Sequence, residues 1–138
     1  MELLDLLGGT RKKKEIEVSI ADKNVKLIMQ TLTQEEQVEV FGRVANYMNT
    51  VHMITASQVP TLARSILSIN NIPLEQYSEV QSQIQEMEKL EPSKPIDINL
   101  IKEKCLNKLP ETLINVFYNK YIQLKSEHTA EIEKTVKN

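Results

Sequence analysis

The chain has no tryptophan, three glycines and one cysteine among its 138 residues, and aromatic residues make up only 4% of it. With so few aromatics, the core must be built from leucine, isoleucine, valine and methionine. Three glycines are too few for a loop-rich β-sandwich or a glycine-rich phosphate loop. A single cysteine, Cys105, excludes an internal disulfide and a zinc site of four cysteines. These absences favour a mostly helical protein.

The chain also lacks an excess of positive charge, since its net charge is −2 and its isoelectric point is near 5.8. Dedicated nucleic-acid-binding domains usually carry a strong positive excess because they neutralise phosphates. The first residues, Met-Glu-Leu-Leu-Asp, are acidic where a signal peptide is basic. No apolar run reaches the roughly 18 residues of a membrane span. We therefore expect a cytosolic protein without a membrane partner, for which nucleic acid is an improbable ligand.

The clearest pattern lies between Lys12 and Met48. Apolar residues alternate with mostly polar ones on two successive segments, which predicts a β-hairpin over about 15–31 with Asp22-Lys23-Asn24 as its turn. A lone two-stranded hairpin is not stable in water, so its apolar face must pack on a helix or a partner. Its open edges are also able to extend a partner's sheet. The alternating apolar residues are Ile16, Val18, Ile20, Val25, Leu27 and Met29.

A helix is expected to follow the hairpin, over about 34–50. Thr33 and Glu36 have the spacing of a capping box, in which each side chain bonds the other residue's amide. Apolar residues then recur in steps of three and four, which predicts one buried stripe. That stripe consists of Val38, Phe41, Val44, Ala45 and Met48.

The rest of the chain is predicted to be helical with interruptions. A break over 50–57 precedes a helix that starts near Pro60 and continues to Ile69. An acidic amphipathic helix covers 74–90, and Asp97 caps the helix after it. The last helix, about 111–136, has a nearly seven-residue repeat that favours packing on its own domain, with coiled-coil oligomerisation as the alternative. Its stripe is Leu113, Phe117, Tyr121, Leu124, His128 and Ile132.

Together these elements predict an α+β protein, mostly α, with an N-terminal β-hairpin followed by about five helices in a helical bundle. We divide the chain into an N-terminal arm (1–11), a hairpin plus helical domain (12–90), a linker (91–95) and C-terminal helices (96–138). The linker is assigned because prolines at 92 and 95 exclude a continuing helix.

Two segments at the start of the chain have alternative interpretations. The arm carries Leu3, Leu4, Leu6 and Leu7 before a glycine pair, so it packs on its own domain or docks on another subunit. The basic run Arg11–Lys14 is either a solvated strand entrance or a phosphate contact.

No residue pattern indicates catalysis. His52 and His128 lie in different elements without a metal-ligand spacing, and Cys105 has no local histidine partner. Glu35 and Glu36 are explained by helix capping rather than by acid–base chemistry. We therefore expect no catalytic, metal-binding or cofactor-binding residues and no enzyme activity.

The hairpin and the helix after it resemble a known group of proteins. The segments concerned are Lys14-Glu15-Ile16-Glu17-Val18, Val25-Lys26-Leu27, Leu32-Thr33-Gln34-Glu35-Glu36 and, later, Leu62 to Asn70. Over about residues 12–75 the chain resembles the small tail and baseplate assembly proteins of tailed bacteriophages, known as tail assembly chaperones or baseplate hub assembly factors.

This resemblance implies a non-enzymatic protein of the host cytoplasm that binds structural tail or baseplate proteins. The alternatives are a structural component retained in the tail, baseplate or neck of the virion, and a nucleic-acid-binding module that uses Arg11–Lys14. Homo-oligomerisation through the C-terminal helix is a further possibility. The candidate partner-binding residues are Leu3, Leu4, Leu6 and Leu7 of the arm and Ile16, Val18, Val25, Leu27 and Phe41, which form the scaffold of the recognition surface.

Overall fold

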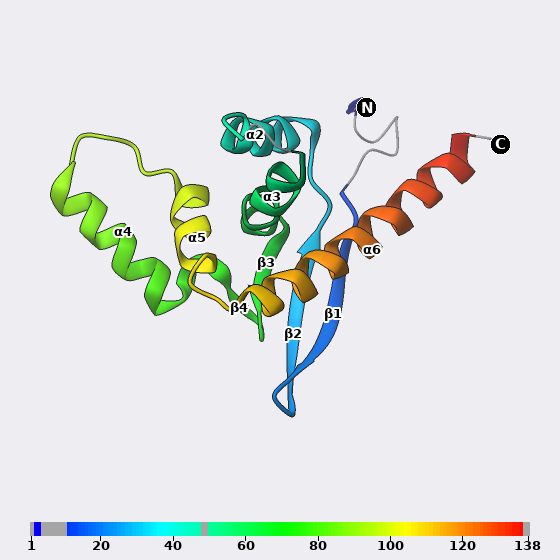
Figure 1. Cartoon of the computed structure of the whole chain (residues 1–138), viewed down its shortest axis with the longest axis horizontal. Coiled ribbons are helices and arrows are strands. Elements are labelled where there is room, and N and C mark those ends of the chain that lie inside the picture. The colour runs from blue at the N-terminus through cyan, green and yellow to red at the C-terminus, as the bar shows by residue number, and fades with distance from the viewer. Residues whose placement is uncertain (1, 4–10, 48–49, 137–138) are drawn as a thin grey trace.

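A computed structural model describes residues 2–3, 11–47 and 50–136 of the chain (Figure 1). Within them, a four-stranded antiparallel sheet of order β1-β2-β3-β4 is combined with five α-helices, which confirms the predicted α+β, mostly α class. The elements are β1 (Lys13–Ile20), β2 (Lys23–Gln30), α2 (Gln34–Val44), α3 (Thr50–Ser65), β3 (Ile66–Ile69), β4 (Ile72–Pro73), the 3₁₀ helix η1 (Leu74–Gln76), α4 (Ser78–Leu90), α5 (Ile98–Leu106) and α6 (Glu111–Val136).

The hairpin of β1 and β2 is present, but its turn is not where the sequence predicted it. Ile20 pairs with Lys23, so the turn consists of Ala21 and Asp22 rather than of residues 22–24. Both turn residues have positive φ, 50° and 65°. A two-residue turn of this kind matches the right-handed twist of the strands, and for that reason it is favoured despite the strain on Ala21.

This turn provides the first prediction. Replacing Ala21 with asparagine and Asp22 with glycine should raise the free energy of unfolding by about 1 kcal/mol, because alanine at positive φ is strained by roughly that amount. Urea denaturation of the two proteins measures the difference. A glycine placed at Asn24, inside β2, should lower stability instead. A turn variant no more stable than the wild type would contradict this view of the turn.

The region after α2 differs most from the prediction. The expected break over 50–57 is part of α3, and Pro60 lies inside this helix rather than in its first turn. The helix predicted to continue to Ile69 ends at Ser65, and the chain forms β3 instead. Strand β3 pairs with β2 and covers an edge that the hairpin alone would leave open. Asn70 and Asn71, both at positive φ, then make the turn to β4.

Helix α6 lies across one face of the sheet, and this packing forms the core (Figure 1). The prediction that the α6 stripe packs on its own domain is confirmed for its central residues, which are buried against strands β1, β2 and β3. The buried residues of this core include Val18, Leu27, Met29, Leu62, Ile66, Phe117, Tyr121 and Leu124.

Two predicted helix caps are confirmed. The Thr33 hydroxyl accepts the Glu36 amide at 3.2 Å, while the Glu36 carboxylate accepts the Thr33 amide at 3.0 Å. Asp97 accepts the amide of Asn99 at 3.0 Å and so caps α5. These caps fix where α2 and α5 begin, and both helices contact α3.

The predicted length of α2 was wrong, and of its predicted stripe Val44 is buried, whereas Ala45 is exposed and Met48 lies outside the described residues. The helix ends at Val44, and the residues it buries are Val40 and Val44. Val38 and Phe41 are 56% and 59% exposed. Only the side of α2 that faces α3 is covered, so the apolar residues on the other side remain at the surface.

Candidate protein-binding surface

Exposed apolar side chains are concentrated on α2, the segment after it and the first half of α3. Of the twelve large apolar residues that are exposed in the described part of the chain, five fall between residues 38 and 54. Val38 and Phe41 lie one helical turn apart on α2, and large apolar side chains exposed side by side in this way are typical of a surface that a partner covers. We call these five residues the α2–α3 surface, and they are Val38, Phe41, Tyr47, Val51 and Ile54.

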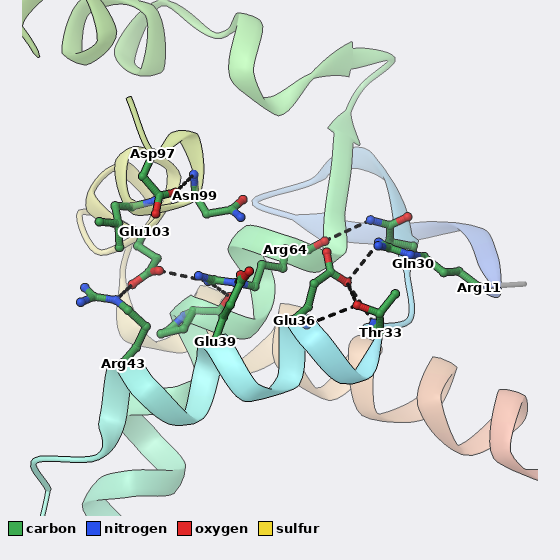
Figure 2. Close-up of polar contacts among 12 residues, drawn as sticks. Arg11, Gln30, Thr33, Glu36, Glu39, Arg43, Arg64, Asp97, Asn99 and Glu103 are labelled. Atoms are coloured by element: carbon green, nitrogen blue, oxygen red, sulfur yellow. Dashed lines mark hydrogen bonds and ion pairs between the residues drawn. The ribbon is translucent and has the colours of Figure 1, made fainter. Parts of the chain in front are cut away.

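A charged network lies on the side of α2 opposite Phe41, and Tyr47 lines a small pocket beside it with Arg43 and Glu103 (Figure 2). Arg64 of α3 lies at its centre, with only 3% of its side chain exposed. Its Nε donates to Glu39 of α2 at 2.9 Å, and its Nη1 donates to Glu103 of α5 at 3.0 Å. Glu103, 4% exposed, also accepts Nε of Arg43 at 2.9 Å. The network therefore joins α2, α3 and α5 side by side.

The network is balanced in charge, with two arginines and two glutamates. Burial lowers the pKa of Arg64, but the hydrogen bonds and charges of Glu39 and Glu103 outweigh this and raise its pKa above the ordinary value. Arg64 Nη1 also donates to the Pro60 carbonyl at 2.9 Å. Because each buried charge has partners within the chain, the network has a structural role and needs no ligand.

The residues proposed from the sequence divide into two groups. Val18 and Leu27 lie in the core, 6% and 0% exposed, and Ile16 and Val25 pack against it. All four support the hairpin; Val18 and Leu27 are not available for contact with a partner, whereas Ile16 and Val25 stay partly exposed. Phe41, in contrast, points to solvent.

The N-terminal arm is largely beyond what the structure describes. Leu3 is 66% exposed, whereas Leu4, Leu6 and Leu7 lie outside the described residues.

The outer edge of β1 is a second exposed feature, since no described strand lies beyond it. Main-chain groups of alternate residues point to opposite sides of a strand. The Lys12 carbonyl accepts the Thr31 amide at 3.0 Å, so it points toward β2. Lys26, the cross-strand partner of Glu17, instead accepts the Asn70 amide at 2.8 Å on the far side. By this alternation, the N–H and C=O groups that point away from β2 belong to Lys13, Glu15, Glu17 and Ser19.

Three of the four cations of the basic run Arg11–Lys14 form ion pairs within the chain. Arg11 pairs with Glu36 at 3.1 Å, and Lys14 pairs with Glu127 of α6 at 2.9 Å. Lys12 pairs with Glu131, whose pKa is lowered by its hydrogen bond to Lys12. A phosphate would have to compete with three carboxylates for these cations. The ion pairs thus argue against the interpretation of the run as a nucleic-acid contact.

An apolar cavity of about 310 Å³ lies between β3, η1, α4 and α5. Cys105 is one of its lining residues, and burial raises the pKa of its thiol, which disfavours the reactive thiolate. The remaining lining offers few polar groups to orient a substrate. The lining residues are Ile69, Leu74, Tyr77, Glu79, Val80, Cys105, Leu106, Lys108 and Leu109.

Two searches of the described residues concern other kinds of site. No group of three or more histidine, cysteine, aspartate or glutamate side chains among them is arranged to hold a metal ion. None of the described helices combines the length and apolar character that crossing a membrane requires.

Comparison of the chain with known proteins gives no match. No protein-family model matches it, and neither a curated protein nor a solved structure is similar enough to count as a match.

The sequence predicted neither the charged network nor four of the five residues of the α2–α3 surface, since only Phe41 was named as partner-binding. Arg64 stands alone in the apolar segment from Pro60 to Ile69, and a lone charge there signals a need for partners. Its partners at 39 and 103 are too distant in sequence to be identified by spacing. Val51 and Ile54 were placed in a loop, so no helical face was considered for them.

Proposed function

We propose that this chain is a non-catalytic assembly protein of a tailed bacteriophage, which binds a structural tail or baseplate protein in the host cytoplasm. The observation that carries the proposal is the α2–α3 surface. Phe41 is the best anchor on it, because large aromatic residues that become buried contribute most to protein–protein binding. Val38 lies one helical turn before Phe41 on the same side of α2.

Two further features support this proposal. The sequence resembles tail assembly chaperones in the region that folds as β1, β2, α2 and α3, which includes the α2–α3 surface. The charged network also holds α2 against α3 and α5, so the exposed residues are presented on a rigid support. A preorganised surface loses less conformational entropy on binding.

The proposal predicts the effect of a charge at its centre. Replacing Phe41 with aspartate should abolish capture of the partner, with an affinity loss of about 2–4 kcal/mol typical of an interface anchor. The measurement is a pull-down with the tagged chain from infected host cells, with the captured proteins identified by mass spectrometry. Because Phe41 is 59% exposed, the variant should melt close to the wild-type temperature.

Leu90 provides the matched control. It is 78% exposed at the end of α4, so its replacement by aspartate adds the same charge away from the α2–α3 surface. This variant should capture the partner as well as the wild type does. Equal capture by the Phe41 variant would exclude the α2–α3 surface, and recovery of proteins other than tail or baseplate components would overturn the assembly role.

Mass spectrometry of purified virions separates a transient assembly factor from a structural component. A transient factor is present in infected cells and absent from purified virions, whereas a structural component is present in both. We propose the transient role because the resemblance is to assembly proteins. Detection of the chain in purified virions would exclude it.

A further inference from the structure

The open edge of β1 suggests a second binding surface. We propose that β1 takes up an extended segment of another protein as a fifth strand of the sheet, and that this segment alternates basic and apolar residues. This goes beyond the proposed function, because β1 and the α2–α3 surface are composed of different residues. A negative result for one of the two surfaces therefore leaves the proposal for the other surface standing.

The main chain of β1 is suited to strand addition. Strand β1 has eight residues, and four of them direct their N–H and C=O groups away from β2. An extended segment of a partner can bind to such a sheet edge by forming main-chain hydrogen bonds with these N–H and C=O groups. The opposite edge of the sheet, β4, has only two residues. The β1 edge is therefore the one long enough for specific recognition.

The charges on β1 indicate what the added strand must carry. Glu15 and Glu17 are exposed on the side of the sheet opposite α6. Residues directly opposite on an antiparallel pair have Cβ atoms about 4.5–5.5 Å apart, so charges there attract or repel. Lysines or arginines two positions apart would face both glutamates. Lys26 of β2 lies 3.5 Å from Glu15 on the inner side, which leaves the outer side for a partner's cation.

The other side of the same edge favours apolar residues. Ile16 packs against the core there, and α6 continues past β1 in Figure 1. The ion pairs Lys14–Glu127 and Lys12–Glu131 hold α6 above the beginning of the strand. Ile132, the residue of α6 that follows Glu131, is 43% exposed. A strand added to β1 would thus lie partly beneath α6, where alternate apolar side chains are covered.

A second copy of the chain fits this edge less well. Antiparallel self-pairing centred on residues 15 to 17 brings glutamates of the two copies opposite each other. Pairing centred on Lys14 would match opposite charges, but Glu127 places α6 directly above Lys14 in each copy. The two α6 helices would then compete for one space, since packed helices need about 8–10 Å between axes. A single extended segment avoids this conflict.

A labelled peptide tests the inference directly. The probe is a peptide of alternating lysine and valine, about as long as β1, and the control peptide has glutamate in place of each lysine. Fluorescence anisotropy with the full chain should show that the lysine peptide binds roughly tenfold tighter than the glutamate peptide, because the attractions to Glu15 and Glu17 become repulsions and outweigh the opposite effect of Lys13 on the same face. Equal binding of both peptides, or of neither, would overturn the inference.

Variants of the chain sharpen this test. Replacing both Glu15 and Glu17 with lysine should reverse the preference toward the glutamate peptide, whereas Glu79→Lys, on exposed α4, should leave it unchanged. Glu17→Pro removes an outward N–H without removing a bond to β2, so the fold should persist while both peptides lose binding. Unchanged binding by Glu17→Pro would contradict strand addition. Sedimentation could instead show that the wild type dimerises and that Glu17→Pro abolishes the dimer. The β1 edge would then bind a second copy of this chain, which would overturn the inference of a segment from another protein.

Discussion

Replacing Glu103 with leucine is expected to lower the free energy of unfolding by about 3 kcal/mol. The physical reason is that Arg64, 3% exposed, would keep its charge but lose the carboxylate 3.0 Å from Nη1. Breaking a buried ion pair by removing one partner typically costs about 3–5 kcal/mol. We expect the lower end of that range because Glu39 still accepts from Arg64. Urea denaturation followed by circular dichroism measures the change.

Two comparisons test whether the buried charge causes this loss. Glu39→Gln removes the other carboxylate partner of Arg64, but Glu39 is 44% exposed, so the loss should stay near or below about 1 kcal/mol. Combining Glu103→Leu with Arg64→Met removes both buried charges and should restore most of the stability. Equal losses from Glu39→Gln and Glu103→Leu, or no recovery in the double variant, would contradict the assigned role of the network.

Replacing Leu27 with alanine is expected to destabilise the protein by about 2–5 kcal/mol, the range measured for buried leucines. Leu27 is 0% exposed. It pairs with Ile16 on one side and Ile69 on the other, so it lies in the middle of the sheet beneath α6. The loss combines the missing apolar contacts with the cavity that they leave. Thermal and urea denaturation both measure it.

Leu90→Ala is the matched control for Leu27→Ala, because the chemical change is the same and Leu90 is 78% exposed. Its effect should stay within about 0.5 kcal/mol, as for most surface substitutions. Similar effects of the two substitutions would mean that β2 is not at the centre of the core.

Local signals in the sequence predicted the elements that depend on neighbouring residues. The alternation in the hairpin, the capping box of Thr33 and Glu36, the Asp97 cap and the span of α6 all use contacts within a few residues. The hairpin turn was misplaced by one residue because Asp-Lys-Asn has turn-forming composition, while the register of the strands requires Ala21 at positive φ.

The elements that were missed depend on distant contacts. A short, mostly apolar segment such as Ile66–Ile69 is compatible with a helix or a strand. Pairing with β2 stabilises the strand conformation. Thr50, Val51 and Thr55 are poor helix formers, yet the packing of α3 against α2, α5 and α6 outweighs their propensity. Asn70-Asn71 was a usable signal, because asparagine pairs favour tight hairpin turns.

The candidate binding surfaces were predicted only in part for the same reason. Phe41 was identified as part of the recognition region, but it was placed on a buried stripe. Exposure on α2 depends on which side meets α3, and that side is selected by Val40, Val44 and the partners of Arg64. The sequence of α2 alone does not contain this information.

Hydrogen–deuterium exchange of the chain, alone and bound to the protein that it captures, tests the binding role of the α2–α3 surface most directly. We predict that amides between Val38 and Ile54 become protected in the complex, whereas those of α5, on the other side of the charged network, do not change. Protection confined to α5 or α4, with none between Val38 and Ile54, would contradict the proposed binding surface.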